Sequence, residues 1–189
     1  MRLLASLAMT TSFLFGAALE GNTQSPVRVV IFEDLQCSDG AKLRVMLDTQ
    51  LLPKYGRAVA FEHRDFPLAK HSWSRRGAMA ARYFDSQNPT VGVEFRRQAL
   101  ANLDKIEAED LASWIASFAR QYAVDPVKAV ASMSSASLAA QVEKDLAEGV
   151  ARGVAKTPTV FVDDEPFVET FTFEAISHAI EAALAAAKK

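Results

Sequence analysis

The only cysteine of this 189-residue chain, Cys37, lies where a hydrophobic run ends in a short acidic loop. If a helix begins at Ser38, the unpaired backbone N–H groups of its first turn point toward the sulfur. The helix dipole then favours the thiolate, which is the nucleophilic form of cysteine. Asp39 adds a negative charge that opposes this effect. The position beside a loop indicates a reactive thiol rather than a small buried hydrophobic residue.

A second feature lies far along the chain, where Thr157-Pro158 precedes the β-rich run 159–162. Proline is unusual in a central strand because it donates no ladder hydrogen bond. A cis peptide bond there would leave backbone groups free to pair with an extended substrate peptide. Taken alone, the residue is an ordinary strand-initiating proline. Taken together with Cys37 and the order of elements, it predicts a cis-proline beside the thiol.

The elements that must position these residues follow from hydrophobic periodicity and turn residues. A β-branched run over 27–32, a helix from Ser38 that ends at Pro53, and a strand over 58–66 predict a parallel pair with a right-handed crossover. Helical patterns follow near 77–84, 90–102 and 111–122, then from an Asp125 cap, and over 138–150 with Gly153 as the C-terminal cap. The chain closes with a hairpin around 163–165 and a helix over 173–184 capped by Thr172.

This order is β-α-β, a helical block, then β-β-α, which predicts an α/β fold with a mixed central sheet. We expect the domain to span residues 27–187 and the helical insertion to cover about 68–153. At this length one domain buries enough surface to need no disulfide framework.

The N-terminus is typical of a secretory signal peptide over residues 1–19. Met1-Arg2 is a short basic start, residues 3–19 are apolar, and small residues end the run. Residues 20–26 are then expected to be a flexible leader. Export predicts a periplasmic or extracellular bacterial protein, with an uncleaved membrane anchor as the alternative. In an oxidising compartment a lone thiol can pair with another molecule, including a second copy through Cys37.

The formal net charge of −2 argues against a nucleic-acid or anionic-membrane surface. The basic pairs Arg75-Arg76 and Arg96-Arg97 are interpreted as solvated helix faces. No spacing typical of metal ligands is present, so we expect neither a metal nor a nucleic-acid partner.

Three segments together resemble the DsbA-like thiol:disulfide oxidoreductases, which have a thioredoxin-like fold with a helical insertion. They are residues 32–37, residues 64–68 with His71 shortly after, and residues 153–162. The resemblance covers about residues 26–187. It implies that Cys37 is the nucleophile, that Pro158 is the cis-proline, and that Thr157 faces the sulfur. Gly40 stands where these enzymes have their resolving cysteine.

Ser38, Asp39, Thr157 and Pro158 are therefore the expected substrate-binding residues around Cys37. Without a second thiol, a mixed disulfide on Cys37 must be resolved by an external thiol or by the substrate's own cysteine. The resemblance thus implies a monothiol oxidoreductase or isomerase that acts on cysteine-containing proteins, peptides or low-molecular-weight thiols. We expect no cofactor other than glutathione as the external thiol. The alternatives are a redox-inactive, chaperone-like binding domain and a kappa-type glutathione transferase.

The three histidines and two glutamates are the remaining candidate functional residues. His63 alternates with inward-facing residues of a strand, and His71 precedes a helix, so both are interpreted as structural. His178 lies opposite the apolar face of the last helix and is expected to face solvent. Glu33 and Glu62 are weak candidates for proton acceptors near the thiol.

Overall fold

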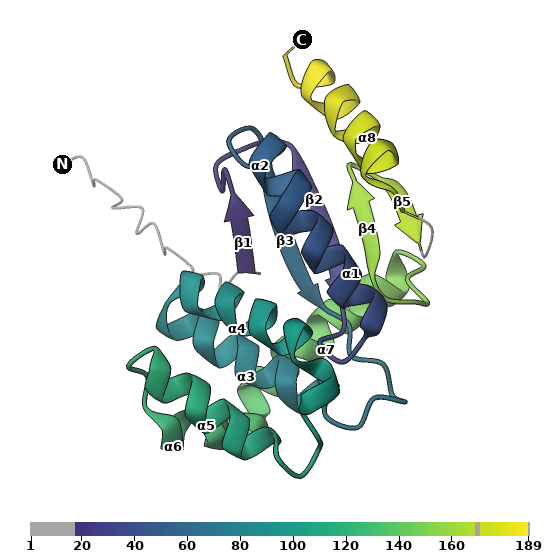
Figure 1. Ribbon diagram of the computed structural model, residues 1–189. Helices are drawn as coiled ribbons and strands as arrows, with labels where there is room; N and C mark the ends of the chain where they lie inside the picture. Colours follow the sequence, from purple (N-terminus) through teal and green to yellow (C-terminus); the bar gives the residue numbers. More distant parts are fainter. Residues whose placement is uncertain (1–17, 169–170, 189) are drawn as a thin grey trace, which may run out of the picture.

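The computed structural model describes residues 18–168 and 171–188. Its centre is a mixed five-stranded sheet with the spatial order β1-β3-β2-β4-β5 (Figure 1). The strands are β1 (Ala18–Gly21), β2 (Arg28–Glu33), β3 (Ala60–Asp65), β4 (Thr159–Val162) and β5 (Glu165–Val168). The β2–β3 pair is parallel and the other pairs are antiparallel. This arrangement confirms the predicted α/β class with a mixed sheet.

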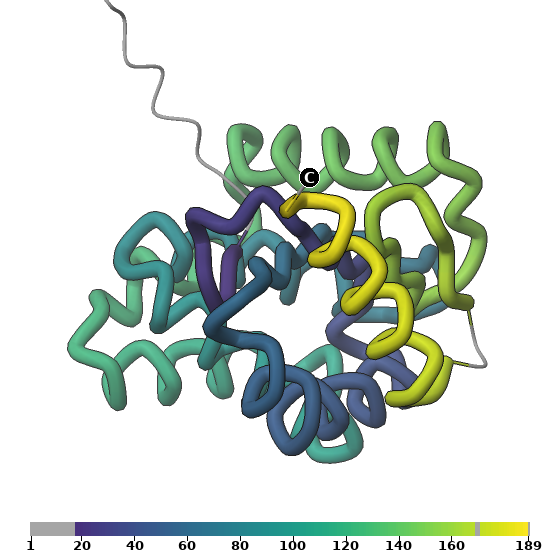
Figure 2. Tube along the Cα trace, turned by 90° about the horizontal axis from the view of Figure 1, so that it is seen from above, coloured from purple at the N-terminus to yellow at the C-terminus, as the bar shows by residue number. Residues whose placement is uncertain are grey.

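Helices cover both faces of the sheet (Figures 1 and 2). Helix α1 (Ser38–Met46) and helix α8 (Phe173–Ala186) pack on one face, where Leu43, Ile176 and Ile180 meet the apolar side chains of β2. Helix α7 (Ala136–Ala151) covers the other face beside β3. The predicted caps are present: the Thr172 hydroxyl accepts from the backbone N–H of Ala175.

The helical block between β3 and β4 has an apolar core of its own. Its helices are α3 (Ser74–Gln87), α4 (Pro89–Ala101), α5 (Leu111–Gln121), α6 (Pro126–Ala131) and α7. The Phe84 ring lies 4.8 Å from that of Phe95 and 4.9 Å from that of Phe118, measured between centroids. Such aromatic clusters combine a large buried area with favourable edge-to-face contacts. The block therefore has a packed core of its own and contacts α1 through α4.

The helical segment that begins at Ser38 is longer than the sequence predicted. Instead of ending at Pro53, the chain passes through a π-helical turn, Leu47–Leu51, into the short helix α2 (Leu52–Tyr55). Proline supplies no N–H for the helical ladder. Pro53 lies in the first turn of α2, where the missing N–H does not matter.

The expected flexible leader over residues 20–26 is contradicted at its start, because strand β1 pairs antiparallel with β3 there. Glu20 is buried in this strand and contacts Arg44, His63 and Arg97. Ser25 is buried as well, and its hydroxyl donates to the carbonyl oxygen of Ala58 at 2.7 Å. Charge pairing that only the folded sheet provides holds this segment in place. Of the signal peptide predicted over residues 1–19, residues 1–17 lie outside the described residues, and the last two belong to β1.

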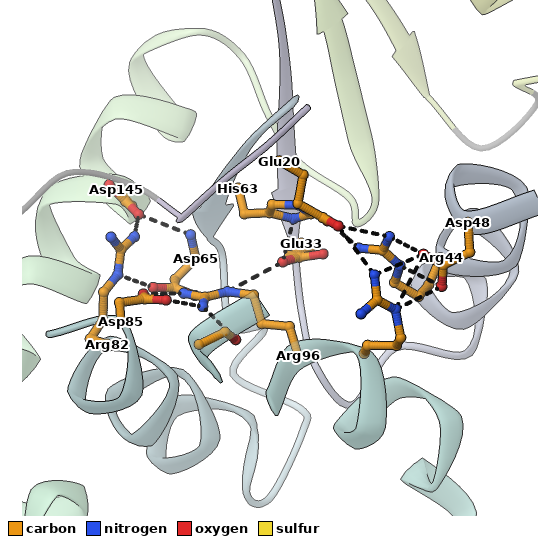
Figure 3. Close-up of polar contacts among 12 residues, drawn as sticks. Glu20, Glu33, Arg44, Asp48, His63, Asp65, Arg82, Asp85, Arg96 and Asp145 are labelled. Atoms are coloured by element: carbon orange, nitrogen blue, oxygen red, sulfur yellow. Dashed lines mark hydrogen bonds and ion pairs between the residues drawn. The ribbon is translucent and has the colours of Figure 1, made fainter. Parts of the chain in front are cut away.

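A layer of buried charges lies between the sheet and the helical block (Figure 3). Arg96 is 1 % exposed and its guanidinium is 2.8 Å from Asp85, and Arg97 lies 3.0 Å from Asp48. The interpretation of Arg96-Arg97 as a solvated face is therefore wrong for Arg96, whereas Arg97 is 34 % exposed and paired with acidic side chains. Helical spacing cannot reveal buried acidic partners that come from other elements. The same layer contains an ion pair between Arg82 and Asp65.

Candidate functional site

Cys37 occupies the N-cap position of α1, as predicted, with φ −93° and ψ 121°. Strand β2 ends at Glu33, and the loop between them is held by the buried carboxylate of Asp34. That carboxylate accepts from the backbone N–H of Gln36 at 2.8 Å and from that of Leu68 at 2.7 Å. The backbone N–H of Cys37 donates to the Asp34 carbonyl at 3.0 Å. The loop therefore fixes the thiol at the positive end of the helix dipole.

The structure brings Thr157 to the thiol from 120 residues away. The Cys37 thiol donates to the carbonyl oxygen of Thr157, with an Sγ-to-oxygen distance of 3.2 Å. The Thr157–Pro158 peptide bond is cis, and β4 begins directly after it. The Thr157 side chain is buried, and its hydroxyl has no hydrogen-bond partner. A buried hydroxyl without a partner is uncommon and is often found where a ligand or water completes the site.

A pocket of about 560 Å³ opens beside the thiol. Its lining comes from the loop before α1, the segment after β3 and the segment before β4: Gln36, Cys37, Ser38, Asp39, Leu68, Ala69, Lys70, His71, Ala155, Lys156 and Thr157. Three of the four expected substrate-binding residues thus line the same pocket as Cys37. The fourth, Pro158, is buried behind it.

Gly40 is buried in the first turn of α1, facing Cys37. A Cβ atom at this position would lie 3.8 Å from Cys37 Cβ, which is the usual separation across a disulfide. It would also lie 3.3 Å from Cδ2 of Leu100. The backbone therefore keeps the geometry of a two-cysteine site, although the residue cannot supply the second thiol.

His71, interpreted from the sequence as structural, has a contact that the sequence did not indicate. Its Nδ1 lies 2.8 Å from Oδ2 of Asp34, and its side chain is 18 % exposed in the wall of the Cys37 pocket. The signal for this contact was weak, because Asp34 and His71 lie on different segments that only the fold brings together. His178 is exposed on α8, as expected.

The two glutamates proposed as proton acceptors do not line the pocket. Glu33 pairs with His63, with an oxygen-to-Nδ1 distance of 2.9 Å, and Glu62 pairs with Arg28 and Arg64. Burial alone would lower the pKa of His63, but the negative charge of Glu33 and a hydrogen bond to Glu20 outweigh it and raise that pKa to about 9. His63 is thus a buried cation that belongs to the charged layer.

Two features are absent from the described part of the chain, residues 18–168 and 171–188. No group of three or more histidine, cysteine or acidic side chains could hold a metal ion there. None of its helices is both long and apolar enough to cross a membrane.

A cysteine that caps the first helix, opposite a cis-proline loop on a mixed sheet with a helical insertion, defines a DsbA-like thioredoxin fold. The chain belongs to the thioredoxin family, whose model matches residues 16–182. No curated protein sequence is similar enough to count as a match.

Solved structures give the same fold. BdbD from Bacillus subtilis in its oxidised form is 21 % identical, with a TM-score of 0.76 over 89 % of this chain and 93 % of that one. The thiol-disulfide exchange protein alpha-DsbA2 from Wolbachia pipientis is 17 % identical, with a TM-score of 0.74 over 88 % and 86 %. ScsC from Proteus mirabilis is 14 % identical, with a TM-score of 0.70 over 90 % and 74 %.

Proposed function

We propose that this protein is a monothiol thiol–disulfide exchange enzyme that acts through Cys37. One observation carries the proposal: the only thiol of the chain lies at the start of α1, 3.2 Å from the Thr157 carbonyl oxygen and on the wall of an open pocket. A helix N-terminus stabilises the thiolate, which is the attacking species in disulfide exchange.

The reaction takes two exchange steps. The Cys37 thiolate attacks one sulfur of a substrate disulfide, forms a mixed disulfide and releases the other substrate sulfur as a thiolate. An external thiolate then attacks the mixed disulfide, forms a new disulfide with the substrate sulfur and releases Cys37. Each step makes one S–S bond and breaks one, so no further oxidant is required. Glutathione is the external thiol that we propose, since Gly40 provides none.

The proposed partners are proteins or peptides with cysteines, which would lie in the pocket between Thr157 and the Ser38-Asp39 turn. An extended peptide can hydrogen-bond to the backbone of the Thr157 segment, as in other strand-addition complexes. The N-terminal sequence supports export to the periplasm or the exterior of a bacterium, where disulfides persist. A Cys37-linked homodimer forms when the Cys37 thiolate of a second copy attacks Cys37 in the mixed disulfide and releases the substrate thiolate.

The test is to incubate the protein with glutathione disulfide and with a peptide that contains a disulfide. Mass spectrometry should show one adduct, on Cys37, and excess glutathione should release it over several cycles. The Cys37→Ser variant should form no adduct. If wild-type Cys37 stays unmodified in the folded protein, or if its adduct is never released, the enzyme proposal is wrong.

A redox-inactive binding domain is the second candidate, favoured by Gly40 in the resolving position and by the unpartnered Thr157 hydroxyl. The two candidate functions differ in whether they require the Cys37 thiol. A binding domain would hold a reduced peptide equally well in wild type and in Cys37→Ser, whereas the enzyme would lose covalent capture.

A further inference from the structure

His71 lines the same pocket as Cys37, and behind it the imidazole is paired with the buried carboxylate of Asp34. The Asp34 side chain is fully buried, and it accepts from two backbone N–H groups as well as from the imidazole. The carboxylate is therefore fixed by the loop that also positions Cys37. His71 is fixed in turn at its backbone, where its N–H donates to the Leu68 carbonyl at 3.0 Å.

This pairing decides which nitrogen of His71 is available for chemistry. Because the ionised carboxylate can only accept hydrogen bonds, Nδ1 of His71 carries the proton that lies between them. The free lone pair of a neutral imidazole is then on Nε2. Among the described residues Nε2 has no hydrogen-bond partner. A carboxylate that orients an imidazole beside a nucleophile is the arrangement of general-base sites.

Because the chain has no second thiol, the external thiol that resolves the mixed disulfide must be deprotonated, and a general base can do this. A resolving thiol that arrives from solution is largely protonated near neutral pH, and only its thiolate attacks a disulfide. His71 and Cys37 line the same pocket, so a thiol that approaches a mixed disulfide on Cys37 enters the space that His71 borders.

We propose that His71 is the general base for the external thiol that resolves the Cys37 mixed disulfide, with Asp34 as its positioning residue. This inference rests on the proposed function. Nε2 takes the proton of the incoming thiol as its sulfur attacks the substrate sulfur of the mixed disulfide. The bond to Cys37 breaks, Cys37 leaves as a thiolate, and the imidazolium releases its proton to that thiolate or to water.

Other charges around the pocket contribute to any pH profile. Lys70 neighbours His71, while Asp39 and Lys156 line the remaining walls. Asp39 is paired with Lys42 at 2.7 Å. The test therefore compares thiols in one protein and does not rely on a single pH profile.

The experiment starts from protein that carries glutathione on Cys37 and measures its release by quenched-flow mass spectrometry. One resolving thiol is 2-mercaptoethanol, which is mostly protonated at neutral pH, and the other is 4-mercaptobenzoate, which is mostly ionised. The main variant is His71→Asn, whose amide can still donate to Asp34 but provides no base. His71→Gln is the second variant, and His178→Gln is the matched control on the exposed face of α8.

We expect His71→Asn to slow release by 2-mercaptoethanol about a hundredfold near pH 7, the lower end of the range of general-base effects. The loss should disappear with 4-mercaptobenzoate, and also at a pH where 2-mercaptoethanol is itself ionised. His178→Gln should match wild type. Equal slowing with both thiols, or no slowing, would overturn the role of His71 while leaving Cys37 chemistry intact. A wild-type adduct that no thiol releases would overturn the proposed function as well.

Discussion

At the scale of single residues, the site differs from a two-cysteine site only in the side chain at position 40, where glycine replaces the second cysteine. Its backbone lies in the first turn of α1, and an added Cβ would meet Cys37 Cβ at disulfide distance. The nearest obstacle is Cδ2 of Leu100, a flexible methyl that must move by a few tenths of an ångström. The site thus lacks a second thiol but has the space to hold one.

We therefore expect Gly40→Cys to form an intramolecular disulfide with Cys37 under mild oxidation, because the Cβ separation needs no backbone movement. Two thiols should titrate in the reduced protein and none after oxidation, and the variant should gain dithiol reductase activity in an insulin precipitation assay. Gly40→Ser has a similar volume and serves as the control without a second thiol. Two free thiols in oxidised, folded Gly40→Cys would contradict this geometry.

The residues of the site were predictable to different degrees. Cys37 and Thr157 could be placed because each lies beside a strong local signal, the end of a strand and a proline before a strand. Their contact follows once the strand order is known. The pairing of His71 with Asp34 could not be predicted, because it depends on how the loop after β3 folds back over the loop after β2.

At the scale of elements, β1 is held to the sheet by charge as well as by its ladder with β3. Burial would raise the pKa of Glu20, but contacts with His63 and Arg44 outweigh it and lower that pKa to about 2. The two shifts have opposite signs: Glu20 is held as an anion and His63 as a cation. Each depends on the other, since a buried charge without a partner is strongly destabilising.

A pH dependence of stability follows from His63. Its pKa is raised from 6.5 to about 9 on folding, so its contribution is fully present below pH 6.5 and is lost as the pH rises through 9. Compared with His63→Gln, the wild-type advantage in unfolding free energy should shrink by on the order of 3 kcal/mol between mildly acidic and strongly alkaline pH. Urea denaturation across this range measures it. A pH-independent difference between the two proteins would show that His63 is not a buried cation.

The sequence predicted the helices and strands better than it predicted the layer of buried charges between the sheet and the helical block. Periodicity located α5 and caps located α6, since Asp125 accepts from Val127 N and Lys128 N as expected. Both signals lie within one segment of sequence. The charged layer joins β1, β2, β3 and the helical block, so no local pattern distinguishes buried Arg96 from a solvated arginine.

At the scale of the whole molecule, the position of β1 bears on how the chain is processed. A cut after residue 19, the boundary that the apolar run predicts, would remove Ala18 and Leu19, which pair with His63 and Glu62. A cut further along would also remove Glu20 and leave the buried Arg44 and His63 without a carboxylate they contact. Loss of one member of a buried ion pair costs about 3–5 kcal/mol.

If the protein is exported as proposed, we expect its mature form to begin at or before Ala18, which N-terminal sequencing of secreted material would show. A chain that starts at Ala18 keeps the whole of β1 and is the reference for this comparison. A chain that starts at Asn22 should be less stable by several kcal/mol, because it loses β1 and exposes the edge of β3. Glu20→Gln in the longer chain separates the two losses, since it removes the charge but keeps the strand. Full stability in the chain that starts at Asn22 would mean that β1 adds nothing to the fold.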